Sequence, residues 1–142
     1  MKKDFDGWNS TKKNIEQKAQ CVLYREQEVW WSSIGINVGF EQDGKNELFE
    51  RPVLIFRKFN KEMFWALPMT SKNKEGKFYY SIMVNGIKRS IILSQLRLLS
   101  TKRLIRRVSK ISDKEFERIE KAVVGVIKTD PLRGPQVPNG NL

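Results

Sequence analysis

Short apolar segments separated by polar or glycine-containing loops fill the middle of the chain. Residues 28–35 are rich in aromatic and β-branched side chains, a composition typical of a strand. The continuous apolar run at 53–56 has the length of a buried strand, and a polar turn at 59–62 separates it from the next run at 63–67. Pro68 cannot donate a ladder hydrogen bond, so we expect it to end this second strand. The pattern therefore predicts a locally paired hairpin.

A second hairpin follows, and after it a basic segment that the pattern leaves open. Residues 78–84 have strand character, and the Asn85-Gly86 pair behind them is the strongest two-residue hairpin signal in the chain. We expect residues 91–93 to form the partner strand. Between 96 and 108, basic side chains separate short apolar positions, which is typical of edge strands and equally of a helical turn.

One amphipathic helix is predicted over residues 112–128. Ser112 and Glu115 have the spacing of a capping box, and apolar side chains from Phe116 to Ile127 recur on one face. No helix is predicted between the strands, which excludes a parallel βαβ architecture. The pattern therefore predicts a mainly β fold, a small closed or half-closed barrel with a C-terminal amphipathic helix.

The two ends of the chain differ from its middle. Residues 1–24 are polar and lysine-rich, with a weak helical pattern at 10–20, and we interpret them as an N-terminal extension. Residues 129–142 are rich in proline and glycine, a composition that predicts a flexible tail because it cannot bury apolar surface. The expected organisation is a single domain over residues 25–128 with an appendage at each end.

The charge balance bears on the kind of partner that the protein binds. The chain has 27 Lys and Arg against 16 Asp and Glu, which gives a formal net charge of +11 and a pI of about 9.9. Such an excess favours a polyanionic partner, with nucleic acid as the leading candidate. The ordinary alternative is that the charge serves solubility alone.

The chain contains no histidine and a single cysteine, Cys21. Any proton transfer must therefore use Arg, Lys, Glu, Asp, Tyr, hydroxyls or water. One cysteine excludes an internal disulfide and, without histidine, leaves no zinc site, so we expect no metal and no cofactor. No signal sequence or membrane-spanning apolar run is present, which together with the cysteine content predicts a soluble, cytoplasmic protein.

Four short stretches, in order, carry a family resemblance: Gly39-Phe40-Glu41-Gln42, Arg51-Pro52-Val53-Leu54-Ile55, Pro68-Met69-Thr70-Ser71 and Ser94-Gln95-Leu96-Arg97. Together they resemble the ribonuclease toxins MazF, PemK and Kid, over about residues 25–128. The resemblance implies an SH3-like barrel, a homodimer, cleavage of single-stranded RNA, and neutralisation by a partner antitoxin. It aligns Arg51 with the family's catalytic arginine. It also aligns Thr70, which Ser71 follows, with the family's catalytic threonine motif.

The chemistry of metal-free RNA cleavage gives these residues roles. The neighbouring 2′-hydroxyl attacks phosphorus, so the protein must accept a proton, stabilise the phosphate charge and help the 5′-oxygen leave. The planar guanidinium of Arg51 suits phosphate binding, and the Thr70 hydroxyl can donate to a phosphate oxygen. Glu41 in the first loop is the best local candidate for the proton acceptor. Family members often carry an acid where this chain has Ser94, so either Glu41 or an activated hydroxyl must take that role. Each residue also has an ordinary non-catalytic interpretation: Arg51 as a surface arginine, Thr70 as a turn-forming threonine and Glu41 as a solvated glutamate.

Basic and planar side chains next to these stretches are candidates for RNA binding, since single strands are held by cations and stacking groups. The candidate RNA-binding residues are Gln42, Ser71, Lys72, Lys74, Lys77, Tyr79, Gln95 and Arg97. A second basic run at 102–110 fits RNA or an acidic antitoxin equally well. The alternative functions are a non-enzymatic SH3-like module that binds nucleic acid, and a CcdB-like toxin directed at a topoisomerase.

Overall fold

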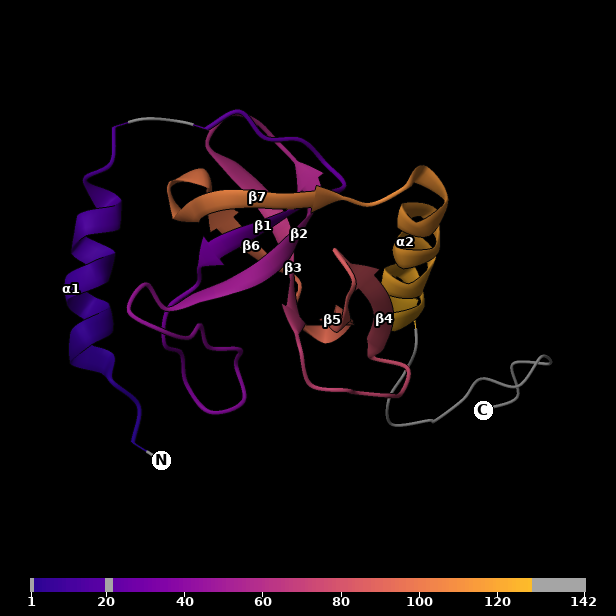
Figure 1. Cartoon of the computed structure of the whole chain (residues 1–142), viewed down its shortest axis with the longest axis horizontal. Coiled ribbons are helices and arrows are strands. Elements are labelled where there is room, and N and C mark those ends of the chain that lie inside the picture. Colours follow the sequence, from indigo (N-terminus) through magenta and orange to yellow (C-terminus); the bar gives the residue numbers. More distant parts are fainter. Residues whose placement is uncertain (1, 20–21, 129–142) are drawn as a thin grey trace.

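The computed structural model describes residues 2–19 and 22–128. Helices stand at both ends of the described chain, with the strands between them (Figure 1). The elements are α1 (Phe5–Glu16), β1 (Glu28–Ser33), β2 (Glu50–Lys58), β3 (Met63–Thr70), β4 (Tyr79–Val84), β5 (Ile87–Ile92), β6 (Arg97–Ser100), β7 (Leu104–Lys110) and α2 (Asp113–Lys128), with short 3-10 turns at Leu93–Gln95 and Thr101–Arg103. The tail predicted over 129–142 and Cys21 lie outside the described residues.

The strands form one curled antiparallel sheet in the order β4-β5-β3-β2-β1-β7. β3 is shared between two neighbours on one edge: its first half pairs with β6 and its last two residues pair with β5. This branching curls the sheet into a half-barrel, and α2 packs beside β4 at one end (Figure 1). The predicted mainly β fold, a small SH3-like barrel with a C-terminal amphipathic helix, is confirmed.

Both predicted hairpins are present, but the partner strand of the second is β5 at Ile87–Ile92 and not 91–93, and Pro68 does not end its strand. β3 continues through Pro68 to Thr70. Pro68 pairs with Val53 of β2 and lies between the β3 residues that pair with β6 and those that pair with β5. At that point no third strand requires an N–H from β3, which is the setting in which a strand tolerates proline.

The basic segment that the pattern left open contains both kinds of structure. β6 and β7 are short strands, and the 3-10 turn at Thr101–Arg103 joins them. Adjacent strand residues face opposite sides of a sheet, and Trp30 is accordingly buried in the core while Trp31 is only half-buried. The two adjacent tryptophans therefore face opposite sides of the sheet.

Two apolar clusters hold the fold, one on each face of the sheet. The first packs Val29, Leu54, Leu67 and Ile91 against the Phe116, Ile119 and Val123 face of α2. The second lies under β6 and β7 and includes Tyr24, Trp30, Val53, Ile55, Phe64, Leu99 and Leu104. Burying each such side chain contributes about 1.5–3 kcal/mol. Because β2 serves both clusters, the position where it begins is firmly held.

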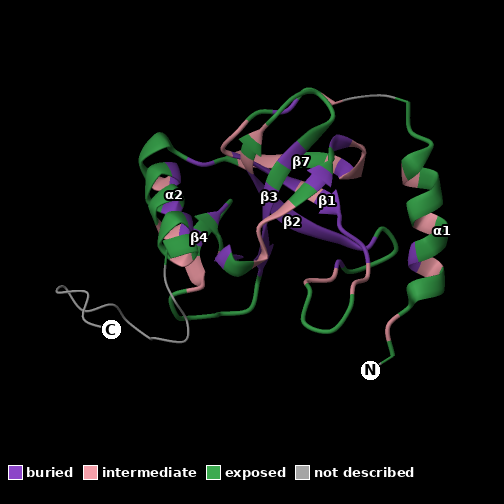
Figure 2. Ribbon diagram, turned by 180° about the vertical axis from the view of Figure 1, so that it is seen from behind, coloured by how far each residue is buried: buried purple, intermediate pink, exposed green. Residues whose placement is uncertain are grey.

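The N-terminal helix begins earlier than predicted. The pattern placed helical character at 10–20, whereas α1 spans Phe5–Glu16, with Asp4 Oδ1 accepting the Gly7 amide at 2.9 Å as its N-cap. Most of α1 is exposed, but Trp8 is buried (Figure 2). Neither described helix is both long and apolar enough to cross a membrane.

Candidate functional site

The long loop between β1 and β2, residues 34–49, is folded tightly at its base. The amides of Ile34 and Gly35 both donate to the Phe49 carbonyl, at 3.0 and 3.2 Å, and the Gly44 amide donates to the Gly35 carbonyl at 2.7 Å. A Cβ on Gly44 would lie 1.7 Å from the Phe49 oxygen, so only glycine fits there. The loop therefore has a defined shape beside the start of β2.

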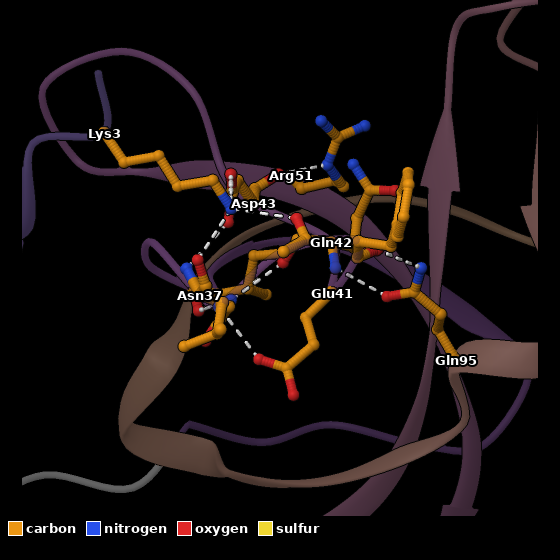
Figure 3. Close-up of polar contacts among 11 residues, drawn as sticks. Lys3, Asn37, Glu41, Gln42, Asp43, Arg51 and Gln95 are labelled. Atoms are coloured by element: carbon orange, nitrogen blue, oxygen red, sulfur yellow. Dashed lines mark hydrogen bonds and ion pairs between the residues drawn. The ribbon is translucent and has the colours of Figure 1, made fainter. Parts of the chain in front are cut away.

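Arg51, the second residue of β2, is enclosed by this loop (Figure 3). Its side chain is buried; Nε donates to the Asp43 carbonyl at 2.6 Å and Nη1 donates to the Met69 carbonyl at 3.0 Å. When the Gln42 amide is turned so that its oxygen faces Arg51, that oxygen accepts from Nη2 at 2.8 Å and from Nε at 3.1 Å. The guanidinium plane is thus fixed by the loop on one side and by β3 on the other.

Charged neighbours also act on Arg51. Burial lowers the pKa of the Arg51 guanidinium, the Asp43 carboxylate raises it, and Arg89 on β5 lowers it. The carboxylate that acts on the Arg51 pKa is therefore that of Asp43. Sequence reasoning missed both Asp43 and Arg89. Asp43 could have been found from its position directly after Gln42, whereas nothing in the pattern connects Arg89 with Arg51.

Thr70 directly follows Met69, whose carbonyl accepts from Arg51 Nη1. Its hydroxyl oxygen accepts the Lys72 amide at 3.2 Å, and its side chain is buried at the end of β3. No acceptor among the described residues takes its hydroxyl proton, so that O–H can donate to a ligand. Ser71 is exposed at the start of the following loop.

Glu41, Gln95 and Arg97 line a neighbouring cavity of ≈ 490 Å³, together with Phe40. Gln95 ties this cavity to the loop, since its Oε1 accepts the Gln42 amide at 2.6 Å and its Nε2 donates to the Phe40 carbonyl at 3.1 Å (Figure 3). Burial lowers the pKa of Arg97, and Glu41 raises it. The predicted residues thus form two groups that meet at Gln42.

The Glu41 carboxylate belongs to the second group. It is exposed, and its Oε1 accepts the Val38 amide at 2.9 Å, so it caps its own turn. The other oxygen has no hydrogen-bond donor among the described residues. Glu41 therefore faces the cavity with one oxygen free, next to Arg97 and away from the Asp43 carboxylate that acts on Arg51.

The predicted lysines follow Thr70 on the loop between β3 and β4. Lys72, Lys74 and Lys77 are all exposed, and Lys77 Nζ lies 5.2 Å from the centre of the Phe78 ring. Tyr79 is half-buried on β4, the edge strand of the sheet. These residues border the Arg51 and Thr70 group. Among the described residues, their hydrogen bond to that group comes from the Lys72 backbone amide and not from a side chain.

The basic run at 102–110 is partly neutralised by acids from other strands. Arg106 pairs with Glu50 at 3.2 Å and Arg107 pairs with Glu28 at 3.0 Å. Arg106 also lies 5.1 Å from the centre of the Trp31 ring, and Arg89 lies 5.5 Å from it. The run has no acid within it, so this neutralisation could not be seen in the local pattern.

Solved structures share this fold at low sequence identity. MazF (Form-I) from Deinococcus radiodurans superposes with a TM-score of 0.60 at 15% identity, covering 76% of this chain and 99% of that chain. An endoribonuclease in complex with its cognate antitoxin, from mycobacterial species, gives 0.57 at 10% identity, covering 76% and 98%. MazE-MazF (Form-II) from Deinococcus radiodurans gives 0.54 at 12% identity, covering 77% and 99%. No curated protein sequence matches the chain.

The sequence itself also matches a family model. The model describes the PemK-like, MazF-like toxin of type II toxin-antitoxin systems, and it matches residues 25–127. This range starts after α1, includes every described strand and reaches the last turn of α2. It therefore contains both groups of site residues that meet at Gln42. Since the match covers most of the chain, this protein belongs to the family of PemK-like, MazF-like toxins of type II toxin-antitoxin systems.

Proposed function

We propose that the protein is an endoribonuclease toxin that cleaves single-stranded RNA, including mRNA, without a metal ion and so inhibits translation. The observation that carries this proposal is the buried Arg51 guanidinium, held beside the Thr70 hydroxyl by the Asp43 and Met69 carbonyls. A fixed guanidinium next to a free hydroxyl donor is suited to the charge that develops on a reacting phosphate. Residues 25–128 form the toxin domain in this proposal.

Arg51 has N–H groups left for the phosphate. A guanidinium carries five N–H donors. With Gln42 turned toward it, one N–H on each terminal nitrogen has no acceptor among the described residues. These two donors and the Thr70 hydroxyl can bind the non-bridging oxygens. Because they are fixed before RNA arrives, little reorganisation is needed when charge develops on phosphorus.

The remaining steps make and break bonds at phosphorus and transfer two protons. The 2′-hydroxyl oxygen bonds to phosphorus and loses its proton, the bond from phosphorus to the 5′-oxygen breaks, and the 5′-oxygen takes up a proton from water. The products are a 2′,3′-cyclic phosphate and a free 5′-hydroxyl. We assign the first proton to Glu41, whose free carboxylate oxygen faces the cavity next to the Arg51 group.

The RNA strand crosses both groups of site residues in this proposal. Gln42, Gln95 and Arg97 bind the nucleotide in the ≈ 490 Å³ cavity. Beyond Thr70, a second set of side chains follows the backbone and offers a stacking ring: Ser71, Lys72, Lys74, Lys77 and Tyr79. Exposed cations with neighbouring rings are the usual means of holding single strands.

The partners follow from family membership. We propose that the toxin acts in the cytoplasm as a homodimer and that a cognate antitoxin neutralises it. The mycobacterial endoribonuclease described above was solved in complex with its cognate antitoxin, and the Form-II structure from Deinococcus radiodurans is of MazE with MazF, which supports the last of these proposals. Size-exclusion chromatography with light scattering measures the dimer directly, and a monomer at micromolar concentration would contradict it.

One experiment decides between cleavage and binding alone. Purified protein is incubated with a long single-stranded RNA in excess EDTA, and the products are tested for a cyclic phosphate end. Arg51→Ala and Thr70→Val should each reduce cleavage by about 10²-fold or more with the fold unchanged, and Glu41→Gln should reduce it as well. If the wild-type protein leaves the RNA intact, the proposed enzymatic function is wrong. Binding that persists without cleavage would indicate a non-enzymatic nucleic-acid-binding module instead.

A further inference from the structure

Lys3 makes three polar contacts, all with the loop that encloses Arg51. Its ammonium donates to the carbonyls of Asn37 at 2.7 Å and Gly39 at 3.1 Å, and it pairs with the Asp43 carboxylate at 3.1 Å. An ammonium has three N–H donors, so the three loop acceptors can use all the donors of this side chain. Figure 3 shows the Lys3 side chain reaching over the loop toward Asp43.

The three acceptors belong to the part of the loop that shapes the site. The second Asp43 oxygen accepts the Asn37 amide at 2.7 Å, and the Asn37 side chain donates to the Gln42 carbonyl at 2.8 Å. The Asp43 carbonyl in turn accepts from Arg51 Nε at 2.6 Å. A continuous path of polar contacts therefore leads from Lys3 through Asp43 to the guanidinium that we place on the phosphate.

α1 fixes the position from which Lys3 reaches the loop. The Trp8 ring packs edge-on against Phe49, with centroids 5.6 Å apart, and lies so close to Gly35 that a Cβ there would fall 2.2 Å from the indole. The Arg103 guanidinium lies 5.7 Å from the centre of the same indole. The helix therefore rests on the base of the loop that Lys3 holds.

The other end of α1 is attached to the barrel as well. Lys102 Nζ donates to the Glu16 carbonyl at 2.8 Å, and Lys18 Nζ donates to the Lys102 carbonyl at 3.2 Å. With the helix held at both ends, Lys3 extends from a fixed support. A free N-terminus would lose conformational entropy in making the same contacts.

We propose that Lys3 is a positioning residue of the active site, which orders the loop that presents Asp43, Gln42 and Glu41. The inference rests on the proposed ribonuclease function. Residues 2–19 lie outside the family match at 25–127, so this segment is an addition by which this chain completes a site built by the toxin domain. Lys3 touches neither RNA nor the reacting atoms; it acts through Asp43.

The test compares Lys3→Met with Lys2→Met. Lys2 is exposed and makes no polar contact with the described residues, so both variants lose one positive charge at the same end of the chain. Loss of Lys3 should lower kcat by about ten-fold, since small displacements of catalytic groups have effects of this size or larger. KM should shift equally in the two variants, because their total charge is the same. Lys3→Arg, which keeps the charge and several donors, should restore most of the rate.

A second readout does not depend on cleavage. Amide hydrogen exchange should become faster at Asn37, Val38 and Gln42 in Lys3→Met and stay unchanged in Lys2→Met. The first two amides donate to side chains of the ordered loop, and the Gln42 amide donates from the loop to Gln95. Amides of β2 and β3 serve as internal controls for folding. Equal exchange in the two variants, or faster exchange with an unchanged kcat, overturns the positioning role. If the wild-type protein cleaves no RNA, the proposed function falls, and the exchange data alone then support or overturn ordering of the loop by Lys3.

Discussion

At the scale of single residues, the side chain of Arg51 combines a structural and a chemical task. The Asp43 carbonyl holds the guanidinium at Nε, the Met69 carbonyl holds it at Nη1, and Gln42 can accept from Nη2 and Nε. This arrangement uses a planar fork with donors in fixed directions, which a lysine ammonium cannot reproduce. The shape of the arginine, and not only its charge, therefore determines what this position can do.

The first prediction concerns this shape. Arg51→Lys keeps the positive charge but leaves at least one of the two buried carbonyls without its donor and removes the paired N–H groups. We expect single-turnover RNA cleavage to fall by about 10²–10³-fold. Arg57→Lys is the matched control, because Arg57 lies on the same strand, is exposed and has no polar contact among the described residues. Equal rates for the two variants would show that charge alone matters at Arg51.

Local motifs singled out Arg51 and Thr70, and the structure places Arg51 at the start of β2 and Thr70 at the end of β3, two residues beyond the Pro68 that the pattern expected to end this strand. The neighbours of Arg51 were harder to predict. The charge of Arg89 on β5 lowers the Arg51 pKa, and Lys3 in the N-terminal segment pairs with Asp43. Such contacts depend on how the sheet curls and where α1 docks, which hydrophobic periodicity does not determine.

At the scale of elements, the loop 34–49 is the least predictable part and the most constrained. Its glycines and its polar run at 42–46 indicate only a loop. In the structure, Gly35 is needed because Trp8 occupies the space of a side chain, and Gly44 is needed because the Phe49 carbonyl does. Tertiary contacts of this kind have no local signature, and the early start of α1 at Phe5 has the same origin, since one buried tryptophan anchors an otherwise polar helix.

The second prediction tests the base of this loop. Gly44→Ala places a Cβ 1.7 Å from the Phe49 carbonyl oxygen, so the backbone must move. We expect the free energy of unfolding to fall by more than about 2 kcal/mol. In Gly125→Ala the new Cβ meets nothing within 4 Å on α2, and the better helix propensity of alanine should stabilise the protein by up to about 1 kcal/mol. Chemical denaturation measures both changes, and a neutral Gly44→Ala would refute the close approach.

The third prediction tests the docking of α1. Trp8→Ala removes the ring that packs on Phe49 and Gly35, and we expect a loss of about 3 kcal/mol from the stability of the helix on the barrel. Phe5→Ala, on the same helix but half exposed, should change that stability by less than about 0.5 kcal/mol. Hydrogen exchange of the α1 amides reports the loss locally. Equal protection of α1 in the two variants would mean that Trp8 does not anchor it.

At the scale of the whole molecule, the net charge of +11 is not evenly available to a polyanion. Internal ion pairs use several cations, among them Lys3 with Asp43, Arg106 with Glu50 and Arg107 with Glu28. The lysines of the loop after Thr70 have no such partner among the described residues. The total charge is therefore a poor guide to where RNA binds, and the unpaired cations next to the site are a better one.

The fourth prediction uses this difference. Changing Lys72, Lys74 and Lys77 together to Gln removes three exposed cations beside Thr70. Because binding of this variant releases fewer counterions from the RNA, the slope of log K against log salt should fall by about 2 for single-stranded RNA. The control changes Lys114, Lys121 and Lys128 on α2, which are also exposed, so the net charge falls by the same amount. Fluorescence anisotropy with the non-cleaving Arg51→Ala background measures both slopes. If long-range attraction by the whole molecule dominates binding, the two triple variants will lose the same slope; if contacts beside the site dominate, only the first will.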